Sequence, residues 1–409
     1  MKKGFYPLLV FLTLLATTFA CTLPFATPQP AGDQVATVVA ATLQALTPTL
    51  SVGGPPTSTP VGLLPHPLYF LNKDGKGFEQ VFRLETDGQT VSQITFEPAA
   101  VSSYDVSPVG GGIVYVANNQ LLLIDAAGAG RRVLVDGGPL DENNPFVSSV
   151  NDPAYSPDGR IVAYWHKGLN LYAVSTGVSN QVLEKQTTDP ISGAPAPAEL
   201  YLPQKYSPDG SKLLITIAIP NSDGIFAGIY YPDSGSLVRL TGGEGAGLCC
   251  GEQAWSPDGS ALFNANAVLG FFSTGLWRVD VASGNVTTLI PSEAGGGNYN
   301  LAAEPYLAPD GQLYFFFGTA PAPNDFIDRG PVQMVRSAPD GVTGRTVLRP
   351  ETFEGLNEAL WAPDASFVIL AKAPTDTVYA GGVIELYYAD GGQSMIPLLA
   401  FGQRLKWGP

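Results

Sequence analysis

Tyr206-Ser207-Pro208-Asp209-Gly210 is the stretch that decides the fold, because near-copies of it recur along the chain. Close copies begin at Tyr155, Trp255, Leu307 and Trp361, and shorter ones stand at Val106-Ser107-Pro108 and Trp407-Gly408-Pro409. Their prolines fall at positions 108, 157, 208, 257, 309, 363 and 409, so the repeat is about 50 residues long. Self-similarity at this period predicts a propeller or another array of repeats.

The chemistry of this stretch is that of a tight turn. Ser at the first position, Pro at the second and Gly at the fourth suit a type I turn, and Asp accepts hydrogen bonds from nearby backbone amides. An aromatic-ended strand precedes each turn, and an apolar strand such as 161–165 follows it. A third and a fourth strand, joined by a second turn such as 233–235, complete the repeat. Four strands per repeat are typical of one propeller blade. We therefore interpret the aspartates of these turns as folding devices.

The two ends of the repeat array predict how it closes. Residues 66–95 contain three strands and lack the aromatic-ended one, whereas residues 403–409 have the pattern of that missing strand. We predict an all-β, seven-bladed β-propeller over residues 66–409, built from four-stranded antiparallel blades. The C-terminal strand completes the first blade and closes the ring, which removes exposed sheet edges.

Composition narrows the range of partners. The chain has 409 residues, of which 45% are hydrophobic and 14% charged, and its formal net charge is −15. Nucleic-acid binding requires clustered Lys and Arg, and no such cluster occurs in the sequence. Cations or basic protein surfaces are the partners that this composition favours.

The N-terminus has the pattern of an export signal. Lys2 and Lys3 precede an apolar run from Phe5 to Ala16, and Ala20 stands directly before Cys21. This resembles a bacterial lipoprotein signal, in which the cysteine receives lipid; cleaved secretion and a retained anchor are the alternatives. We expect a signal peptide at 1–20. Residues 21–65 would then hold the lipid-attachment site, a short amphipathic helix and a Pro/Thr/Gly-rich tether, so that the protein is extracytoplasmic and bound to a membrane through its lipid.

The Ser-Pro-Asp-Gly turns and the segment 72–95, N-K-D-G-K-G-F-E-Q-V-F-R-L-E-T-D-G-Q-T-V-S-Q-I-T, together resemble the repeats of the TolB-type propeller family. They are also similar to the propellers of tricorn-type and dipeptidyl-peptidase-type proteases. The resemblance covers residues 66–409 and implies protein binding across the propeller face or channel, without a cofactor. The chain lacks the N-terminal α/β domain of periplasmic TolB proteins and has the lipid site and tether in its place.

Alignment on the turn prolines brings one set of polar residues to equivalent positions. Five residues before each proline, in blade order, stand Arg404, Ser103, Asp152, Pro203, Glu252, Glu304 and Glu358. Equivalent positions of a propeller encircle its channel, so we expect four carboxylates and Arg404 to converge at a channel mouth. Three interpretations stay open: the carboxylates accept backbone N–H bonds or are solvated, they bind a protein or basic peptide, or they bind a cation such as Ca²⁺.

Cys249 and Cys250 are adjacent, and they are the remaining thiols if Cys21 carries lipid. An oxidising compartment favours a vicinal disulfide, although its geometry is strained. Two free buried thiols are the second alternative, and a metal or redox role is the third.

Little in the sequence predicts an enzyme. His66 and His166 are the only histidines, which excludes a His-rich metal site and disfavours a Ser-His-Asp triad. The sequence also lacks a nucleophile elbow, a P-loop and a dinucleotide fingerprint. We therefore expect a protein-binding or scaffolding module without a cofactor. The alternative is a channel-sited hydrolase or lyase acting on a glycan or lactone. Tyr299, Phe326 and Phe353, which we expect on loops, add an aromatic surface as a third hypothesis.

Overall fold

In the computed structural model of the protein, the described residues are 62–409 without 141–144, 189–194, 221, 223, 241–247, 249–251, 271, 323–327 and 376. The predicted signal, Cys21, almost all of the tether, Phe326 and the pair Cys249 and Cys250 lie outside them. The described part forms one compact unit. It contains strands and a single 3₁₀ turn at Pro145–Val147, but no α-helix. No described segment forms a helix with the length and apolar character that crossing a bilayer requires.

The strands form antiparallel sheets in chain order. Four sheets have four strands each: β4 (Val101–Val106), β5 (Ile113–Ala117), β6 (Gln120–Ile124) and β7 (Arg132–Asp136); β8 (Asn151–Tyr155), β9 (Ile161–Trp165), β10 (Leu169–Ala173) and β11 (Val178–Leu183); β14 (Leu200–Tyr206), β15 (Leu213–Ala218), β16 (Ile225–Tyr231) and β17 (Ser236–Leu240); β18 (Glu252–Trp255), β19 (Ala261–Asn266), β21 (Gly275–Asp280) and β22 (Val286–Ile290). A fifth sheet has five strands: β23 (Glu293–Gly295), β24 (Asn298–Leu307), β25 (Leu313–Pro321), β27 (Gln333–Ser337) and β28 (Thr346–Val347). Two short ribbons pair β12 (Gln186–Thr188) with β13 (Pro195–Pro197) and β20 (Val268–Leu269) with β26 (Asp328–Arg329).

The last sheet joins the two ends of the described chain. Its seven strands, in spatial order, are β29 (Leu356–Trp361), β30 (Phe367–Lys372), β31 (Gly382–Tyr388), β32 (Ile396–Trp407), β1 (Leu68–Lys73), β2 (Glu79–Leu84) and β3 (Val91–Gln93). β32 pairs with β31 through Leu399 opposite Ile384, and with β1 through Trp407 opposite Leu68. The predicted terminal strand thus begins earlier than residue 403, and one long strand serves both partners.

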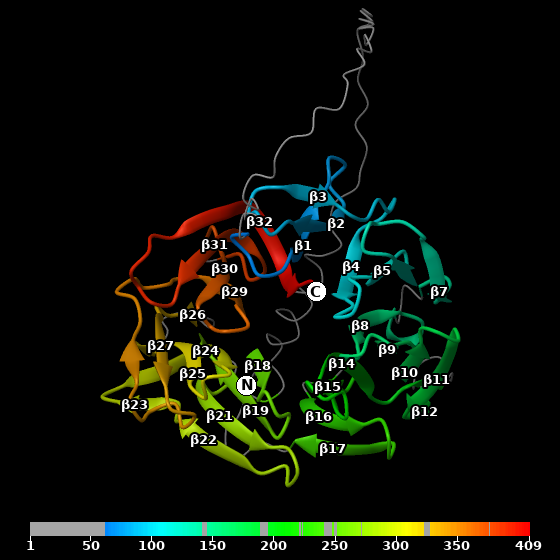
Figure 1. Cartoon of the computed structure of the whole chain (residues 1–409). Coiled ribbons are helices and arrows are strands. Elements are labelled where there is room, and N and C mark those ends of the chain that lie inside the picture. Colours follow the sequence, from blue (N-terminus) through cyan, green and yellow to red (C-terminus); the bar gives the residue numbers. More distant parts are fainter. Residues whose placement is uncertain are drawn as a thin grey trace, which may run out of the picture. The chain divides into compact units, whose positions relative to one another are not determined.

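Figure 1 shows the sheets following one another around a common centre. Apolar clusters bridge neighbouring sheets; one contains Trp165 and Leu169 of the β8–β11 sheet with Tyr206 and Leu213 of the next. Because neighbours cover both faces of a sheet, second strands such as β5 and β19 are buried along their whole length. The all-β class and the four-stranded antiparallel sheets are therefore confirmed, and their arrangement is that of a β-propeller.

The Ser-Pro-Asp-Gly segments form the predicted turns. In the turn after β8, Gly159 N–H donates to the Ser156 carbonyl at 2.8 Å, and the Ser156 hydroxyl donates to the Asp158 carboxylate at 2.6 Å. Turns of successive sheets lie side by side, since a Cβ on Gly210 would lie 3.3 Å from a ring carbon of Pro157. In an antiparallel four-stranded sheet, the hairpins between strands one and two and between strands three and four lie at the same end. We call this end of the sheets the turn end.

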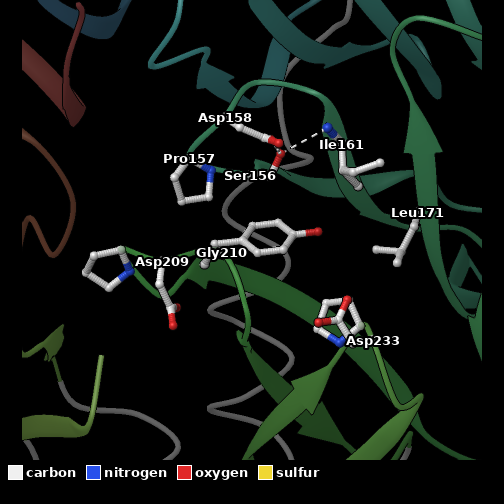
Figure 2. Close-up of a pocket in the computed structure, with 11 residues that line it drawn as sticks. Ser156, Pro157, Asp158, Ile161, Leu171, Asp209, Gly210 and Asp233 are labelled. Atoms are coloured by element: carbon white, nitrogen blue, oxygen red, sulfur yellow. Dashed lines mark hydrogen bonds between the residues drawn. The ribbon is translucent and has the colours of Figure 1, made fainter. Parts of the chain in front are cut away.

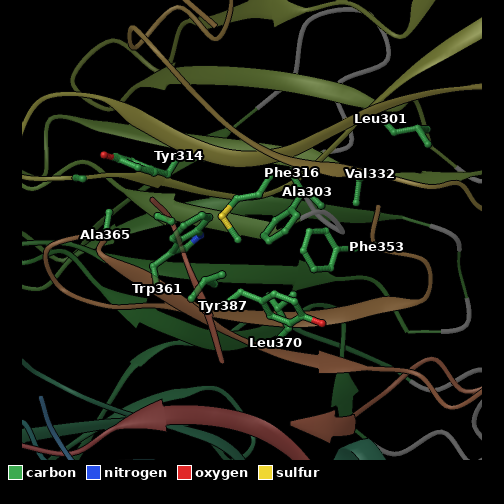
Figure 3. Close-up of a cluster of buried hydrophobic side chains, with 14 of the residues drawn as sticks. Leu301, Ala303, Tyr314, Phe316, Val332, Phe353, Trp361, Ala365, Leu370 and Tyr387 are labelled. Carbon is green, nitrogen blue, oxygen red and sulfur yellow. The ribbon is translucent and has the colours of Figure 1, made fainter. Parts of the chain in front are cut away.

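Of the aromatic residues expected on loops, Tyr299 lies in a strand instead, and Phe353 lies outside the named strands but is buried. Tyr299 belongs to β24. Phe353 is 2% exposed and packs edge to face with Phe316 at 5.3 Å and Tyr387 at 5.0 Å between ring centroids, in the cluster of Figure 3. Its backbone is held by a bridge to Val332, which turns the ring inward.

Candidate functional site

Most of the residues aligned five positions before a turn proline lie at an irregularity of the innermost strands; Glu252 does not, since β18 pairs with β19 in regular register. Register shifts occur between Asn151 and Ala154 in β8 and between Ala303 and Tyr306 in β24. Asp152 and Glu304 within these shifts have φ of 51° and 52°, and Arg404 at the equivalent place in β32 has φ of 56°. These are β-bulges with a left-handed residue, a conformation that side chains other than glycine adopt rarely. We call Asp152, Glu252, Glu304 and Glu358 the inner carboxylates.

Two inner carboxylates bind the backbone of the strand at the equivalent place one repeat later; for Glu304 that strand belongs to the next sheet, and for Glu358 it is β32 of the same seven-stranded sheet. The Glu358 carboxylate accepts the N–H groups of Arg404 at 2.8 Å and Leu405 at 2.5 Å. Glu304 accepts the N–H of Ala359 at 3.0 Å. The bonds to Arg404 and Leu405 satisfy two amides that lie in the irregular part of the pairing between β32 and β1. These carboxylates therefore link the innermost strands of successive repeats.

Indole groups at the ends of the innermost strands make a second set of links. The Trp361 ring N–H donates to the Glu304 carbonyl at 2.9 Å, and the Trp407 ring N–H donates to the Trp361 carbonyl at 2.8 Å. Trp255 donates to the Lys205 carbonyl at 3.4 Å. This explains why the strand before the turn so often ends in Trp: its apolar ring is buried and its one donor reaches the next backbone.

Burial changes the charge of the inner carboxylates. It raises the pKa of Glu252 and that of Glu358 to about 7 each. The pKa of Glu304 is raised well above its usual range, first by burial and then by the nearby carboxylates of Glu252 and Glu358. All three side chains keep partial contact with solvent. At neutral pH this group therefore holds protons, and it is less acidic than its composition indicates.

Glu252 differs from its neighbours in one respect. Its Oε2 atom is buried and has no hydrogen-bond partner among the described residues. A buried polar atom without a partner is uncommon and unfavourable. Glu252 is thus the inner carboxylate with unused capacity to bind a ligand.

Basic residues lie next to this group. Lys406 Nζ contacts Asp105 Oδ1 at 2.6 Å and lies 5.9 Å from the Tyr104 ring centroid. The Lys205 ammonium donates to the Gln253 carbonyl. Burial raises the pKa of Asp152, while Arg404 and Lys406 oppose that shift.

Asp105, Lys205 and Lys406 were not predicted as site residues. All three stand three residues before a turn proline, so the same alignment could have found them. Lys205, Lys406 and Arg404 offset part of the negative charge that the inner carboxylates retain, whereas Asp105 is itself a carboxylate and pairs with Lys406.

Glu304 lies near enough to both Glu252 and Glu358 for their charges to raise its pKa. Ser103 and Pro203 occupy the same positions in β4 and β14 and are buried, and Ser103 Oγ accepts the N–H of Asp152 at 3.3 Å. Within the described ranges, no group of three or more His, Cys, Asp or Glu residues is arranged to hold a metal ion. The described geometry gives the Ca²⁺ interpretation no support.

No protein-family model matches the sequence, and no curated protein matches it either. Among solved structures, this chain is similar to a prolyl endopeptidase at a TM-score of 0.52 and 12% identity, over 84% of this chain and 49% of that one. An oligogalacturonate lyase in complex with manganese gives a TM-score of 0.51 and 10% identity, over 81% and 84%. A putative TolB from Agrobacterium tumefaciens gives 0.41 and 18%, over 73% and 95%, a score too low to support an argument. At these identities the likeness concerns the fold alone.

Proposed function

We propose that this chain is a seven-bladed propeller whose ring is closed by β32, and that it binds a segment of a partner protein at the inner carboxylates. Support for closure comes from the double pairing of β32 and from the apolar cluster in which Leu405 of β32 packs with Leu68 of β1 and Phe367 of β30. Closed propellers present loops and innermost strands to ligands from a rigid frame.

The observation that carries the binding proposal is the unpartnered, buried Oε2 of Glu252 beside two further carboxylates of raised pKa. Such a group offers both donors and acceptors near neutral pH, because protonated and ionised carboxyls coexist there. Peptide backbone and polar side chains provide the complementary groups. The partner in this proposal is a peptide segment bound mainly by hydrogen bonds, with Lys406 and Arg404 limiting the net negative charge.

The test compares partners recovered by the tagged full-length protein from envelope extract, quantified by mass spectrometry. Glu252→Gln keeps the shape but changes the hydrogen-bonding groups, and Glu293→Gln, on exposed β23, is the matched control. We expect one protein to be depleted with Glu252→Gln and retained with Glu293→Gln. Equal recovery of every protein by both variants would refute the binding proposal.

The location belongs to the same proposal: an extracytoplasmic protein attached to a membrane through lipid on Cys21. Its support is the lipoprotein-like N-terminal sequence. Labelling cells with an alkyne fatty acid should mark the wild-type chain and leave Cys21→Ser unmarked. Intact mass with and without reductant determines whether Cys249 and Cys250 are joined.

A hydrolase or lyase acting on a glycan or lactone is the second candidate, and Glu252 is the observation that favours it. A carboxyl with a pKa of about 7 is suited to general acid catalysis near neutral pH. Turnover of a glycan and lactone panel by the wild type, abolished in Glu252→Gln, would support this candidate over simple binding.

A further inference from the structure

A cavity of 490 Å³ lies at the turn end, between the sheet of β8–β11 and the sheet of β14–β17 (Figure 2). Its walls come from the two Ser-Pro-Asp-Gly turns and from the hairpin that follows β16. Ile161 and Leu171 provide apolar surface, while Asp158, Asp209 and Asp233 provide carboxylates. The volume is within the range typical of small-ligand sites.

One repeat earlier, a groove of 400 Å³ occupies the equivalent place. Tyr155 takes the position of Tyr206 and Gly159 that of Gly210, as the alignment of the turns requires. That groove is lined by a basic residue, Arg132. No basic residue lines the later cavity, so the two equivalent sites differ in charge.

Turn chemistry favours the ionised form of two aspartates of the cavity. The Ser156 hydroxyl lowers the pKa of Asp158, and the Ser207 hydroxyl lowers that of Asp209. Each of these two carboxylates has one cation near it: Arg160 Nε lies 3.7 Å from Asp158 Oδ2, and Lys212 Nζ lies 3.5 Å from Asp209 Oδ2.

Asp233 is the third carboxylate and has no ion pair in the described part of the chain. Three carboxylates therefore face two neighbouring cations. The cavity retains about one uncompensated negative charge.

Tyr206 is an independent indication of a missing ligand. The side chain lines the cavity and is 9% exposed, and its hydroxyl has no hydrogen-bond partner among the described residues. Burial raises the pKa of this hydroxyl, and the nearby Tyr230 and Asp158 add to the rise. A buried hydroxyl without a partner is unfavourable unless a water or a ligand satisfies it.

We propose that this cavity binds an alkyl guanidinium or ammonium group, with the aliphatic stem against Ile161 and Leu171 and the cationic head at Asp233 and the Tyr206 hydroxyl. The stem gains from apolar contact, and the head supplies the donors that the hydroxyl oxygen and the carboxylate lack. The group belongs either to a small organic cation or to the side chain of a basic peptide. This site is separate from the inner carboxylates, so it stands if the proposed function fails.

The test uses the full-length protein and isothermal titration calorimetry with two probes, agmatine and a short peptide with one central arginine. We expect at least one probe to bind the wild type. Asp233→Asn and Tyr206→Phe should each weaken it about tenfold, the loss typical of one charge-assisted hydrogen bond. Both substitutions leave the turn hydrogen bonds of Ser156 and Asp158 in place.

Ser175→Ala is the matched control, because Ser175 occupies the position of Asp233 in the hairpin one repeat earlier; Gly177 and Gly235 close the two hairpins with equivalent backbone bonds. It should leave binding unchanged. Tighter binding of the peptide identifies a basic protein segment as the ligand, and tighter binding of agmatine identifies a small cation. Failure of both probes to bind at millimolar concentration, or equal binding by Asp233→Asn and the wild type, would overturn the proposal.

Discussion

Replacing Glu252 by Gln should stabilise the protein at alkaline pH and leave its stability unchanged at acid pH. The folded-state pKa of about 7 lies above the ordinary value of 4.5. Between these two values the folded chain retains a proton that the unfolded chain has released, so stability falls as the pH rises through this window. Below pH 4.5 both states are protonated, and the wild type and the variant then carry the same charge at this position.

The size of the effect follows from the shift. A pKa raised from 4.5 to about 7 corresponds to about 3 kcal/mol between the two protonation states. Because the side chain keeps partial solvent contact and shares protons with Glu304, we expect a gain of about 1 to 3 kcal/mol at pH 8. At pH 4.5 the difference should be under about 0.5 kcal/mol.

Urea unfolding at pH 4.5, 6 and 8, followed by tryptophan fluorescence, measures this difference. The exposed substitution Glu293→Gln should change stability by less than about 0.5 kcal/mol at every pH, as surface substitutions usually do. If Glu252→Gln is equally stable or less stable than the wild type at pH 8, then Glu252 is not held in a site that disfavours its charge. The assignment of Glu252 as the inner carboxylate with unused binding capacity would then also be wrong.

Three further substitutions test the frame in which these sites lie, all by urea unfolding. Trp407→Ala removes the ring N–H bond to the Trp361 carbonyl and the edge-to-face contact with Phe367. It should lower the free energy of unfolding by about 3 kcal/mol. A loss below about 1 kcal/mol would contradict closure by β32. Glu97→Gln should cost about 2 kcal/mol at pH 7, because it leaves Arg131 and Tyr115 without their carboxylate. Its cost should shrink at pH 3, because the pKa of Glu97 is lowered in the folded state and the wild type loses this stabilisation as the pH falls below 4.5; a cost independent of pH would refute the ion pair. Gly382→Ala should cost more than about 3 kcal/mol, since φ is 153° and a Cβ would lie 1.9 Å from the Lys372 carbonyl oxygen, whereas Gly392→Ala, with its nearest atom at 3.8 Å, should cost less than about 1 kcal/mol.

The sequence predicted those features that depend on local chemistry. Ser156, Pro157 and Gly159 specify their turn through bonds within a few residues, so the same string predicted the turn wherever it occurred. Alignment on the turn prolines also placed Glu304 and Glu358 at equivalent positions of successive innermost strands.

The bulge was not predictable in this way. Left-handed backbone at Asp152 and Glu304 is a conformation that few residues other than glycine adopt, although Asp adopts it more often than most, and both residues have bonds to neighbouring sheets. The burial of Phe353 was missed for a related reason: the residue lies outside the named strands, as its surrounding sequence indicates, but its ring packs into the core against Phe316 and Tyr387. The pKa directions were out of reach as well, because the same carboxyl group shifts up or down according to burial and hydrogen bonding.

The effect of burial and hydrogen bonding on each carboxyl pKa determines where the negative charge of the protein lies. The formal net charge of −15 counts every carboxylate equally. At the turn end, hydroxyl and backbone donors lower the pKa of Asp158, Asp258 and Asp364, so these groups stay ionised. Glu252 and Glu358, on the innermost strands, are each partly protonated at neutral pH because burial raises their pKa.

A cationic partner should therefore be attracted to the turn end, and a ligand of the inner carboxylates should bind through hydrogen bonds. Salt separates the two modes. Raising the ionic strength from about 0.01 to 1 M shortens the screening length from about 30 to 3 Å. The affinity of the Asp233 cavity for agmatine should therefore fall strongly. Binding that depends on Glu252 should change little over the same range. If both modes lose affinity equally, the inner carboxylates are ionised after all, and the division of charge between the two places is wrong.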